Sequence, residues 1–348
     1  MFNTFTSAQA SALGIRPEIL HTAQSCCLLR QSRGIYTVLY PCRVHPEFVR
    51  LIDDEESVTL ARSLREDGTN TGRAARFWRL AHMGLITVAP GIRTTDVVSH
   101  ESAALIRCVP ILPMRLTKVM VSNPGRSETQ AVCRRRKRSV PEGSVGPWQG
   151  LAVATAARAA LEMASDVSVE AGVIALDHVI RTAADPDSMR GVLLGMVEAD
   201  GRFARSARLA RCLAWATGLA ESPAESLTVV RFAESGSLPR LRQQVEIYDE
   251  HGRFIARVDF LLDDDKILET DGAAKYKTIA QGGYRRDGED PLEAEKRRQY
   301  ALQALGYEVH RLMWADIIDP ARFRKRMRQA RIVLGPRGTR RSYGNTRL

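Results

Sequence analysis

Apolar residues in the last third of the chain change from a helical spacing to strict alternation and back again. Residues 242–249, 253–262 and 266–272 alternate as half-buried strands do, and turn residues separate them. Because the connections are so short, consecutive strands must run antiparallel. The expected order is a helix at 222–236, those three strands, a helix at 291–306, a strand at 307–317 and a closing helix at 319–334.

The first forty residues show a second pattern, in which two short helices precede a ribbon. Helical spacing covers residues 7–13 and 16–26, Gly14 suits the turn between them, and residues 28–40 alternate around a Ser-Arg-Gly turn. This is the order of a winged helix-turn-helix, whose second helix enters the major groove of DNA. The side chains expected to face bases are Arg16, His21, Thr22, Gln24 and Ser25, and those expected to face phosphates are Arg30 and Arg33. The alternative is a small helical core with a hairpin and no ligand.

Residues 46–218 are expected to form a mixed, mainly helical connector. The Ala-rich segment 151–164 and the segments after it have helical spacing, and a short helix followed by one strand is expected within 96–123. The basic segment CRRRKR at 133–138 could follow a phosphate backbone or form a solvated face. Residues 336–348 are basic and aperiodic, which favours a tail that adds non-specific affinity for polyanions.

The charge balance indicates a polyanionic partner. The 348 residues include 51 Lys and Arg against 40 Asp and Glu, a formal net charge of +11, which is typical of nucleic-acid-binding proteins. The alternative is a basic surface without consequence. No apolar run reaches the roughly 18 residues that a membrane-spanning helix needs. The first residues also lack the features of a signal peptide. No membrane partner and a cytoplasmic location are therefore expected.

The six cysteines give no metal motif at this stage. Only Cys26 and Cys27 are close in sequence, and adjacent cysteines do not by themselves make a zinc knuckle. We expect small thiols, buried or on the surface, in a reducing cell.

Two of the predicted strands carry acidic residues between apolar neighbours. If their turn centres on Asp264, Asp259 lies opposite Glu269, and Asp271 shares the face of Glu269. Carboxylates on one face repel and raise each other's pKa unless a cation lies between them. Oxygen ligands suit Mg²⁺, and Lys275 could assist at a phosphate. Without metal, neutralising Glu269 should stabilise the fold. The alternative is that Arg257 or Lys275 already satisfies these acids.

Two parts of the chain resemble known protein families. Residues from about 221 to 334 resemble the very-short-patch-repair-like branch of the PD-(D/E)XK endonuclease fold, through ESPAES, RVDFLL, ILETDG, KY and EKRRQYALQALGYEVHRLMWADI. The first 45 residues, with SHESAALI and RLTKVMVSN, are similar to winged-helix AbiEi-type antitoxins, many of which carry such a nuclease-like domain. The resemblance implies an α+β multi-domain protein: a winged helix-turn-helix at 1–45, the connector at 46–218, a PD-(D/E)XK domain with a mixed sheet at 219–335, and the tail.

The resemblance also implies roles for single residues. Asp259 and Glu269 would bind the metal, Mg²⁺ or Mn²⁺. Asp271 stands where the fold usually has its lysine, and Lys275 could supply the missing charge. Glu225 would be the acidic residue on the helix that precedes the sheet, and Gln244 would lie near the metal on the first strand. Glu295 and Arg298, on the later helix, would support the site.

These expectations lead to one function and two alternatives. The first is a metal-dependent endonuclease that acts on double-stranded DNA. The second is a transcriptional regulator or antitoxin with a cognate toxin and a nuclease-like domain that does not cut. The third is an RNA-acting nuclease, against which the wing argues because helices do not enter the deep major groove of RNA.

Overall fold

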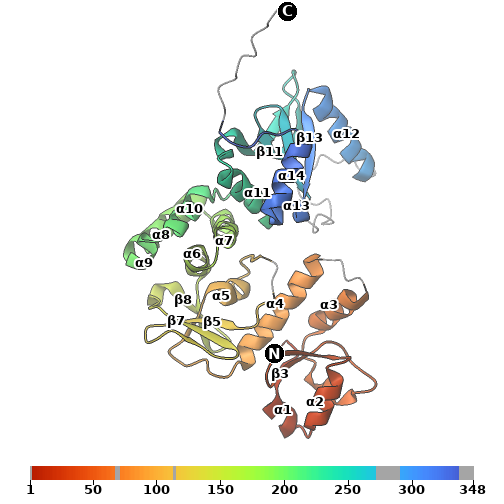
Figure 1. Ribbon diagram of the computed structural model, residues 1–348, viewed down its shortest axis with the longest axis vertical. Coiled ribbons are helices and arrows are strands. Elements are labelled where there is room, and N and C mark those ends of the chain that lie inside the picture. Colours follow the sequence, from red (N-terminus) through yellow and green to blue (C-terminus); the bar gives the residue numbers. More distant parts are fainter. Residues whose placement is uncertain (1, 67–70, 113–114, 272–290, 337–348) are drawn as a thin grey trace, which may run out of the picture.

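The computed structural model describes residues 2–66, 71–112, 115–271 and 291–336. The chain runs in sequence order along an elongated molecule, from an N-terminal unit at one end to a four-stranded sheet at the other (Figure 1). Helices and sheets alternate along it, so the molecule is a mixed α/β protein, as predicted. In the described part of the chain, no helix is long and apolar enough to cross a membrane.

The N-terminal unit has the predicted two helices and hairpin. Its elements are β1 (Thr4–Thr6), α1 (Ser7–Ala12), α2 (Pro17–Ala23), β2 (Leu28–Ser32) and β3 (Ile35–Val38). The strands form an antiparallel sheet in the order β1-β3-β2. Thr6 and Gln9 form a reciprocal capping box that starts α1, and Gly14 has the positive φ of 73° that the turn before α2 requires.

A helical pair joins this unit to the middle of the molecule. After the 3₁₀ turn η1 (Pro46–Leu51), the chain forms α3 (Glu55–Glu66) and α4 (Thr71–Val88). Helix α4 contacts β1 and β3 on one side and a helix and strand of the middle region on the other. The N-terminal unit is therefore docked on the rest of the protein through α4.

The middle region is mainly helical, as predicted, but it also holds a six-stranded sheet of which the sequence predicted one strand. The strands are β4 (Val97–Val98), β5 (Val119–Asn123), β6 (Glu128–Thr129), β7 (Cys133–Lys137), β8 (Val145–Trp148) and β9 (Leu151–Ala154). Their order is β6-β7-β5-β4-β9-β8, and a 3₁₀ turn, η2 (Glu142–Ser144), precedes β8. The helices beside the sheet are α5 (His100–Ile106) and α6 (Ala156–Asp166).

The basic segment 133–138 does not form a continuous surface for phosphates. Arg135 is buried and forms ion pairs with Asp96 at 2.7 Å and with Glu128 at 2.8 Å. Arg138 is also buried, and its guanidinium lies 3.2 Å from Asp166. Two of the charges are therefore neutralised inside the protein, which excludes them from a DNA interface.

A helical stack continues from α6 to the C-terminal sheet. It consists of α7 (Val169–Thr182), α8 (Pro186–Ala199), α9 (Gly201–Ala204) and α10 (Ala207–Trp215). Gly172 lets α7 approach α6 closely, because a Cβ at this position would lie 2.5 Å from the Cα of Ala164. Helix α7 also contacts the first helix of the C-terminal unit, and one hydrophobic core runs through all of these elements.

The C-terminal unit has the predicted element order. It comprises α11 (Pro223–Glu234), η3 (Leu238–Arg240), β10 (Leu241–Tyr248), β11 (Phe254–Leu262), β12 (Lys266–Asp271), α12 (Pro291–Ala304), β13 (Glu308–Met313), α13 (Trp314–Ile318) and α14 (Pro320–Gln329). Strands β10, β11 and β12 are antiparallel neighbours, and β13 is parallel to β12, which gives a mixed sheet. The predicted strand 307–317 ends earlier, because α13 begins at Trp314.

Helices cover both faces of this sheet. Neighbouring strand residues point to opposite faces, and Phe260 and Leu261 accordingly belong to separate clusters. Phe260 packs in the main core with α11 and α14, whose Phe232 and Phe323 rings meet edge to face at 5.4 Å. Leu261 belongs to the cluster that contains Leu302 of α12. The acidic hairpin therefore emerges from a rigid, buried sheet.

Candidate functional site

The first candidate carboxylate, Glu225, lies at the start of α11. Ser222 caps the helix, and its hydroxyl accepts a hydrogen bond from the backbone N–H of Glu225 at 3.2 Å and donates one to Oε1 of Glu225 at 2.8 Å. The backbone N–H of Glu221 donates to Oε2 at 2.9 Å. Glu225 is almost fully buried, so its orientation is fixed by the helix terminus.

The second residue, Gln244, occupies an irregular position in β10. Its φ is +52°, a left-handed conformation that a strand residue with a side chain rarely adopts. The flanking pairs Gln243–Phe260 and Val245–Val258 keep one register, so Gln244 lies across from Asp259. Its amide Nε2 donates to Oε2 of Glu225 at 2.7 Å. Local strain of this kind, at the place where predicted site residues meet, is typical of functional sites.

Asp259, in β11, is half-buried and aimed at the next strand. The pairs of β11 and β12 end at Phe260–Leu268, and Asp259 and Glu269 are the next residues in that register. The carboxylate Oδ2 of Asp259 accepts hydrogen bonds from the backbone N–H and from the hydroxyl of Thr270, both at 2.8 Å. Asp259 therefore faces the end of β12.

The charges of these acids are coupled. Burial raises the pKa of the Glu225 carboxyl to about 7, and the negative charge of Asp259 adds to the rise. The hydrogen bonds from Glu221 and Ser222 oppose that shift but do not cancel it. Glu225 therefore holds its proton to a higher pH than an exposed glutamate does.

Glu269 pairs with a basic side chain, Arg298, and the sequence did not indicate this pairing. The carboxylate is buried in β12, and Nη1 of Arg298 in α12 lies 3.3 Å from its Oε1. Arg298 also binds Glu295, with Nε to Oε2 at 3.0 Å, and Glu295 pairs with Arg311. Burial disfavours the charged guanidinium, but the charges of Glu269 and Glu295 outweigh it and raise the pKa of Arg298. Arg298 thus neutralises part of the acidic cluster.

Two predicted residues cannot be placed with the others. Asp271 is the last residue of β12, and Lys275 lies outside the described residues, as does the tail from 337 onward. The three acidic side chains whose positions are described, Glu225, Asp259 and Glu269, offer only oxygen ligands, and such ligands fit Mg²⁺ or Mn²⁺. However, Glu225, Asp259 and Glu269 are not among the described groups of three or more whose candidate ligand atoms all lie within 4.8 Å. A divalent ion would have to draw these side chains together.

The predicted DNA-contacting residues lie on α2 and the hairpin. Six of them are exposed: Arg16, His21, Thr22, Ser25, Arg30 and Arg33. Gln24 is half-buried, and its Nε2 donates to the carbonyl of Leu20 at 3.1 Å, within the helix itself. These six side chains are therefore open to solvent at the start of α2, along it, just past its end and on the hairpin.

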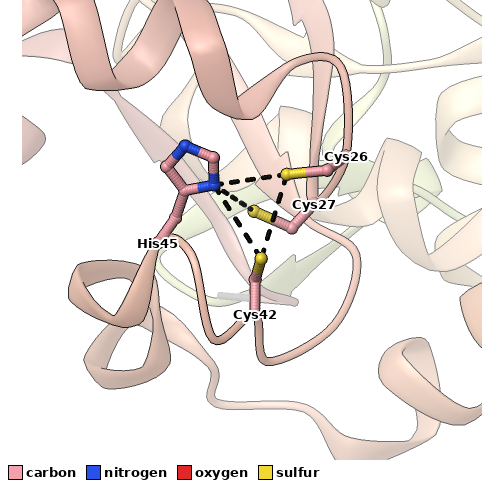
Figure 2. A group of neighbouring side chains, drawn as sticks. All are labelled: Cys26, Cys27, Cys42 and His45. Carbon is pink, nitrogen blue, oxygen red and sulfur yellow. Dashed lines mark hydrogen bonds between the residues drawn. The ribbon is translucent and has the colours of Figure 1, made fainter.

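A further group of candidate ligands was missed in the sequence. The structure brings Cys26, Cys27, Cys42 and His45 together beside the end of α2, with all of their candidate ligand atoms within 4.8 Å of one another (Figure 2). The sequence did not indicate that these three cysteines lie together, although they are free thiols as expected. The signal that could have revealed the group is the C-x-x-H spacing of Cys42 and His45.

Comparisons with known proteins assign no function to these sites. Comparison with protein-family models, with curated proteins and with solved structures finds no match to this chain. Any function must therefore be inferred from the site residues themselves.

Proposed function

We propose that this chain is a double-stranded DNA-binding protein whose C-terminal unit is a PD-(D/E)XK-like, metal-dependent endonuclease. The observation that carries the proposal is the convergence of Glu225, Gln244, Asp259 and Glu269. They come from four successive elements, α11, β10, β11 and β12, in the helix–strand–strand–strand order that the resemblance implies. The mixed sheet with a parallel β13 supports the same fold.

The chemistry follows from what each of these side chains offers. Asp259 and Glu269 would hold Mg²⁺ or Mn²⁺, which would activate a water molecule and neutralise charge on the scissile phosphate. Glu225, whose pKa is raised to about 7, is the carboxyl that a nearby cation would deprotonate. Gln244 orients Glu225 through the 2.7 Å hydrogen bond from its amide.

The test of hydrolysis is plasmid nicking with Mg²⁺ or Mn²⁺, using wild type, Asp259→Ala and Asp264→Ala. Asp264 is a matched control because it lies in the same hairpin, is exposed, and pairs with Arg242. We expect wild type and Asp264→Ala to nick DNA and Asp259→Ala to lose the activity. Equal nicking by all three proteins would exclude the assignment.

DNA docking would use the N-terminal unit as a winged helix-turn-helix. Arg16, just before α2, and His21 in α2 are exposed and could contact base edges. Arg30 and Arg33 on the hairpin could contact phosphates. Replacing Arg30 and Arg33 by Ala should lower the slope of log affinity against log salt by about one unit per contact. An unchanged slope would place the DNA elsewhere.

A second function is favoured by the Arg298–Glu269 pair at 3.3 Å. A cluster whose acid is already neutralised, and which has Asp271 where the fold usually has lysine, suits a DNA-binding regulator or antitoxin that does not cut. This protein would bind its own promoter in EDTA, cleave no DNA with any metal, and associate with a cognate toxin. Metal-dependent nicking that Asp259→Ala removes would decide against it.

A further inference from the structure

Four soft ligands meet where α2 ends. Cys26 and Cys27 lie in the turn after α2, whereas Cys42 and His45 come from the loop between β3 and η1. Nδ1 of His45 lies 3.2 Å from Sγ of Cys26 and 3.8 Å from Sγ of both Cys27 and Cys42. Sγ of Cys26 and Sγ of Cys42 are 3.9 Å apart. Figure 2 shows the three sulfur atoms gathered around this one ring nitrogen.

These separations can be compared with those of a tetrahedral zinc site. Zinc–sulfur bonds of about 2.3 Å and zinc–nitrogen bonds of about 2.0 Å place two sulfurs about 3.8 Å apart and a sulfur about 3.6 Å from the nitrogen. The observed distances of 3.2 to 3.9 Å lie around these values, and no pair exceeds 4.8 Å. The group therefore has the size of a shell around a single ion.

A second observation concerns the orientation of His45. Its Nε2 lies 3.2 Å from the hydroxyl of Thr22, and that hydroxyl is also 3.2 Å from the carbonyl oxygen of Ile19. The carbonyl can only accept, so the hydroxyl proton goes to Ile19 and Nε2–H of His45 donates to Thr22. Nδ1 is then left with its lone pair directed at the sulfurs. Such a partner on the far nitrogen is how proteins orient a metal-binding histidine.

Burial and domain size also favour a metal. Cys27 is fully buried, and His45 is 8% exposed. The core of the N-terminal unit is small and consists of Phe5, Ala10, Ile15, Leu20, Ala23, Cys27, Leu28, Val38 and Phe48. Units of this size often depend on a structural metal or disulfides, because they bury too little apolar surface.

The main alternatives are a thiol–imidazole hydrogen bond and a disulfide. The 3.2 Å contact between Cys26 and His45 would suit the first without any metal. It leaves unexplained why two further sulfurs surround the same nitrogen. For the second, the 3.9 Å between the sulfurs of Cys26 and Cys42 far exceeds a sulfur–sulfur bond of about 2.0 Å.

We propose that Cys26, Cys27, Cys42 and His45 bind one structural Zn²⁺ through three thiolate sulfurs and Nδ1 of His45. Binding changes no oxidation state: the ion forms four coordinate bonds, and the thiol protons leave to solvent. All four positions are filled by protein, so the site is structural rather than catalytic. The ion would tie the end of α2 to the segment after β3.

The experiment measures zinc in the full-length protein purified under reducing conditions, before and after incubation with Zn²⁺ alone and removal of excess metal. Wild type is compared with Cys42→Ser and with the control Cys108→Ser, because Cys108 is exposed and lies outside the group. We expect one zinc per chain in wild type and in Cys108→Ser, and a large loss in Cys42→Ser. Zinc that Cys42→Ser retains, or that wild type never binds, would overturn the proposal.

A second measurement does not depend on how the variant folds. Co²⁺ in wild-type protein should give the intense visible bands of a tetrahedral ion and the near-ultraviolet absorption of thiolate ligands. Under native conditions, three fewer thiols should react with a thiol reagent when Zn²⁺ is bound than after a chelator removes it. An octahedral Co²⁺ spectrum, or an intact mass two hydrogens lower that reveals a disulfide, would contradict the site.

Discussion

The cysteine–histidine group and the acidic cluster are both sets of candidate ligands, but they differ in what already satisfies them. In the N-terminal unit, three sulfurs and a nitrogen surround a common centre. In the C-terminal sheet, Glu269 pairs with Arg298, and Asp259 accepts hydrogen bonds from Thr270. The first arrangement is the one for which we propose an ion, whereas the second is partly neutralised by the protein itself.

This difference shows that ligand type alone does not define a metal site. Carboxylates between apolar residues demand a positive charge, and an arginine can supply it as well as a metal can. Thiols beside a lone-pair nitrogen gain little from one another without a metal. The comparison can be tested by removing, in turn, the partner on which each cluster depends.

The largest expected effect is that of zinc removal. If Zn²⁺ binds the folded unit alone, free zinc at 1,000 times the dissociation constant stabilises it by about 4.1 kcal/mol. A chelator should therefore remove hydrogen-exchange protection from residues 3–52 while the sheet β10–β13 keeps its protection. Equal protection with and without chelator would mean that the cysteine–histidine group is stable without an ion.

The next effect concerns the partner of Glu269. Arg298→Met should destabilise the metal-free protein by about 3 to 4 kcal/mol, because it leaves a buried carboxylate without its cation. For the same reason, Glu269→Gln should now destabilise the protein, although the sequence alone predicted stabilisation through relief of repulsion. Denaturant unfolding of both variants measures this, with Asp264→Ala as the control. A stabilised Glu269→Gln protein would show that repulsion dominates.

A somewhat smaller effect is expected from pH. The pKa of Glu225 rises from its ordinary 4.5 to about 7 on folding, so the folded state binds more protons between these values. The part of the stability that depends on Glu225 should be fully present below about pH 4.5, fall by about 2 to 3 kcal/mol as the pH rises to 7, and then level off. Glu225→Gln should remove this component, because an amide does not titrate in this pH range.

The same pH series tests the acidic cluster for metal. A cation beside Glu225 would favour its charged form, so saturating Mg²⁺ should flatten the fall in wild type and change nothing in Glu225→Gln. Unfolding curves between pH 4.5 and 8, with and without Mg²⁺, give the comparison. An unchanged slope in Mg²⁺ would favour the regulator that does not cut.

The smallest effect is that of Thr22→Val. Losing the acceptor for Nε2 of His45 should weaken zinc binding about tenfold, the lower end for such partners, because Thr22 is exposed. Thr22→Ser keeps the hydroxyl and should bind zinc as wild type does. Competition with a chromophoric chelator measures both. Equal affinity of Thr22→Val and Thr22→Ser would mean that the hydroxyl does not position the histidine.

The sequence predicted the elements that local spacing determines. Alternation and short turns predicted the antiparallel β10–β12, because register follows from the turn. Pro17, Gly14 and the Ser-Arg-Gly turn likewise indicated the N-terminal helices and hairpin. These features depend on neighbours within a few residues.

The rest depends on contacts between distant segments. Strand β4 has two residues, too few for any period, and exists because β5 and β9 flank it. Arg135 is indistinguishable in sequence from its solvated neighbours, and its burial depends on ion pairs with Glu128 and with Asp96, which is distant along the chain. Cys42 and His45 reach Cys26 only after the hairpin has folded.

Helix α11 is covered by other elements on nearly all of its sides, because every residue from Ala224 to Phe232 is buried. It packs against two parts of the molecule, because it contacts α7 of the middle region as well as β12 and α13 of the C-terminal unit. A fragment that begins at residue 219 would expose the surface that α7 covers and should aggregate. Selection on the C-terminal unit must therefore act on the middle helices too, and the two parts are expected to be inherited, and to unfold, together.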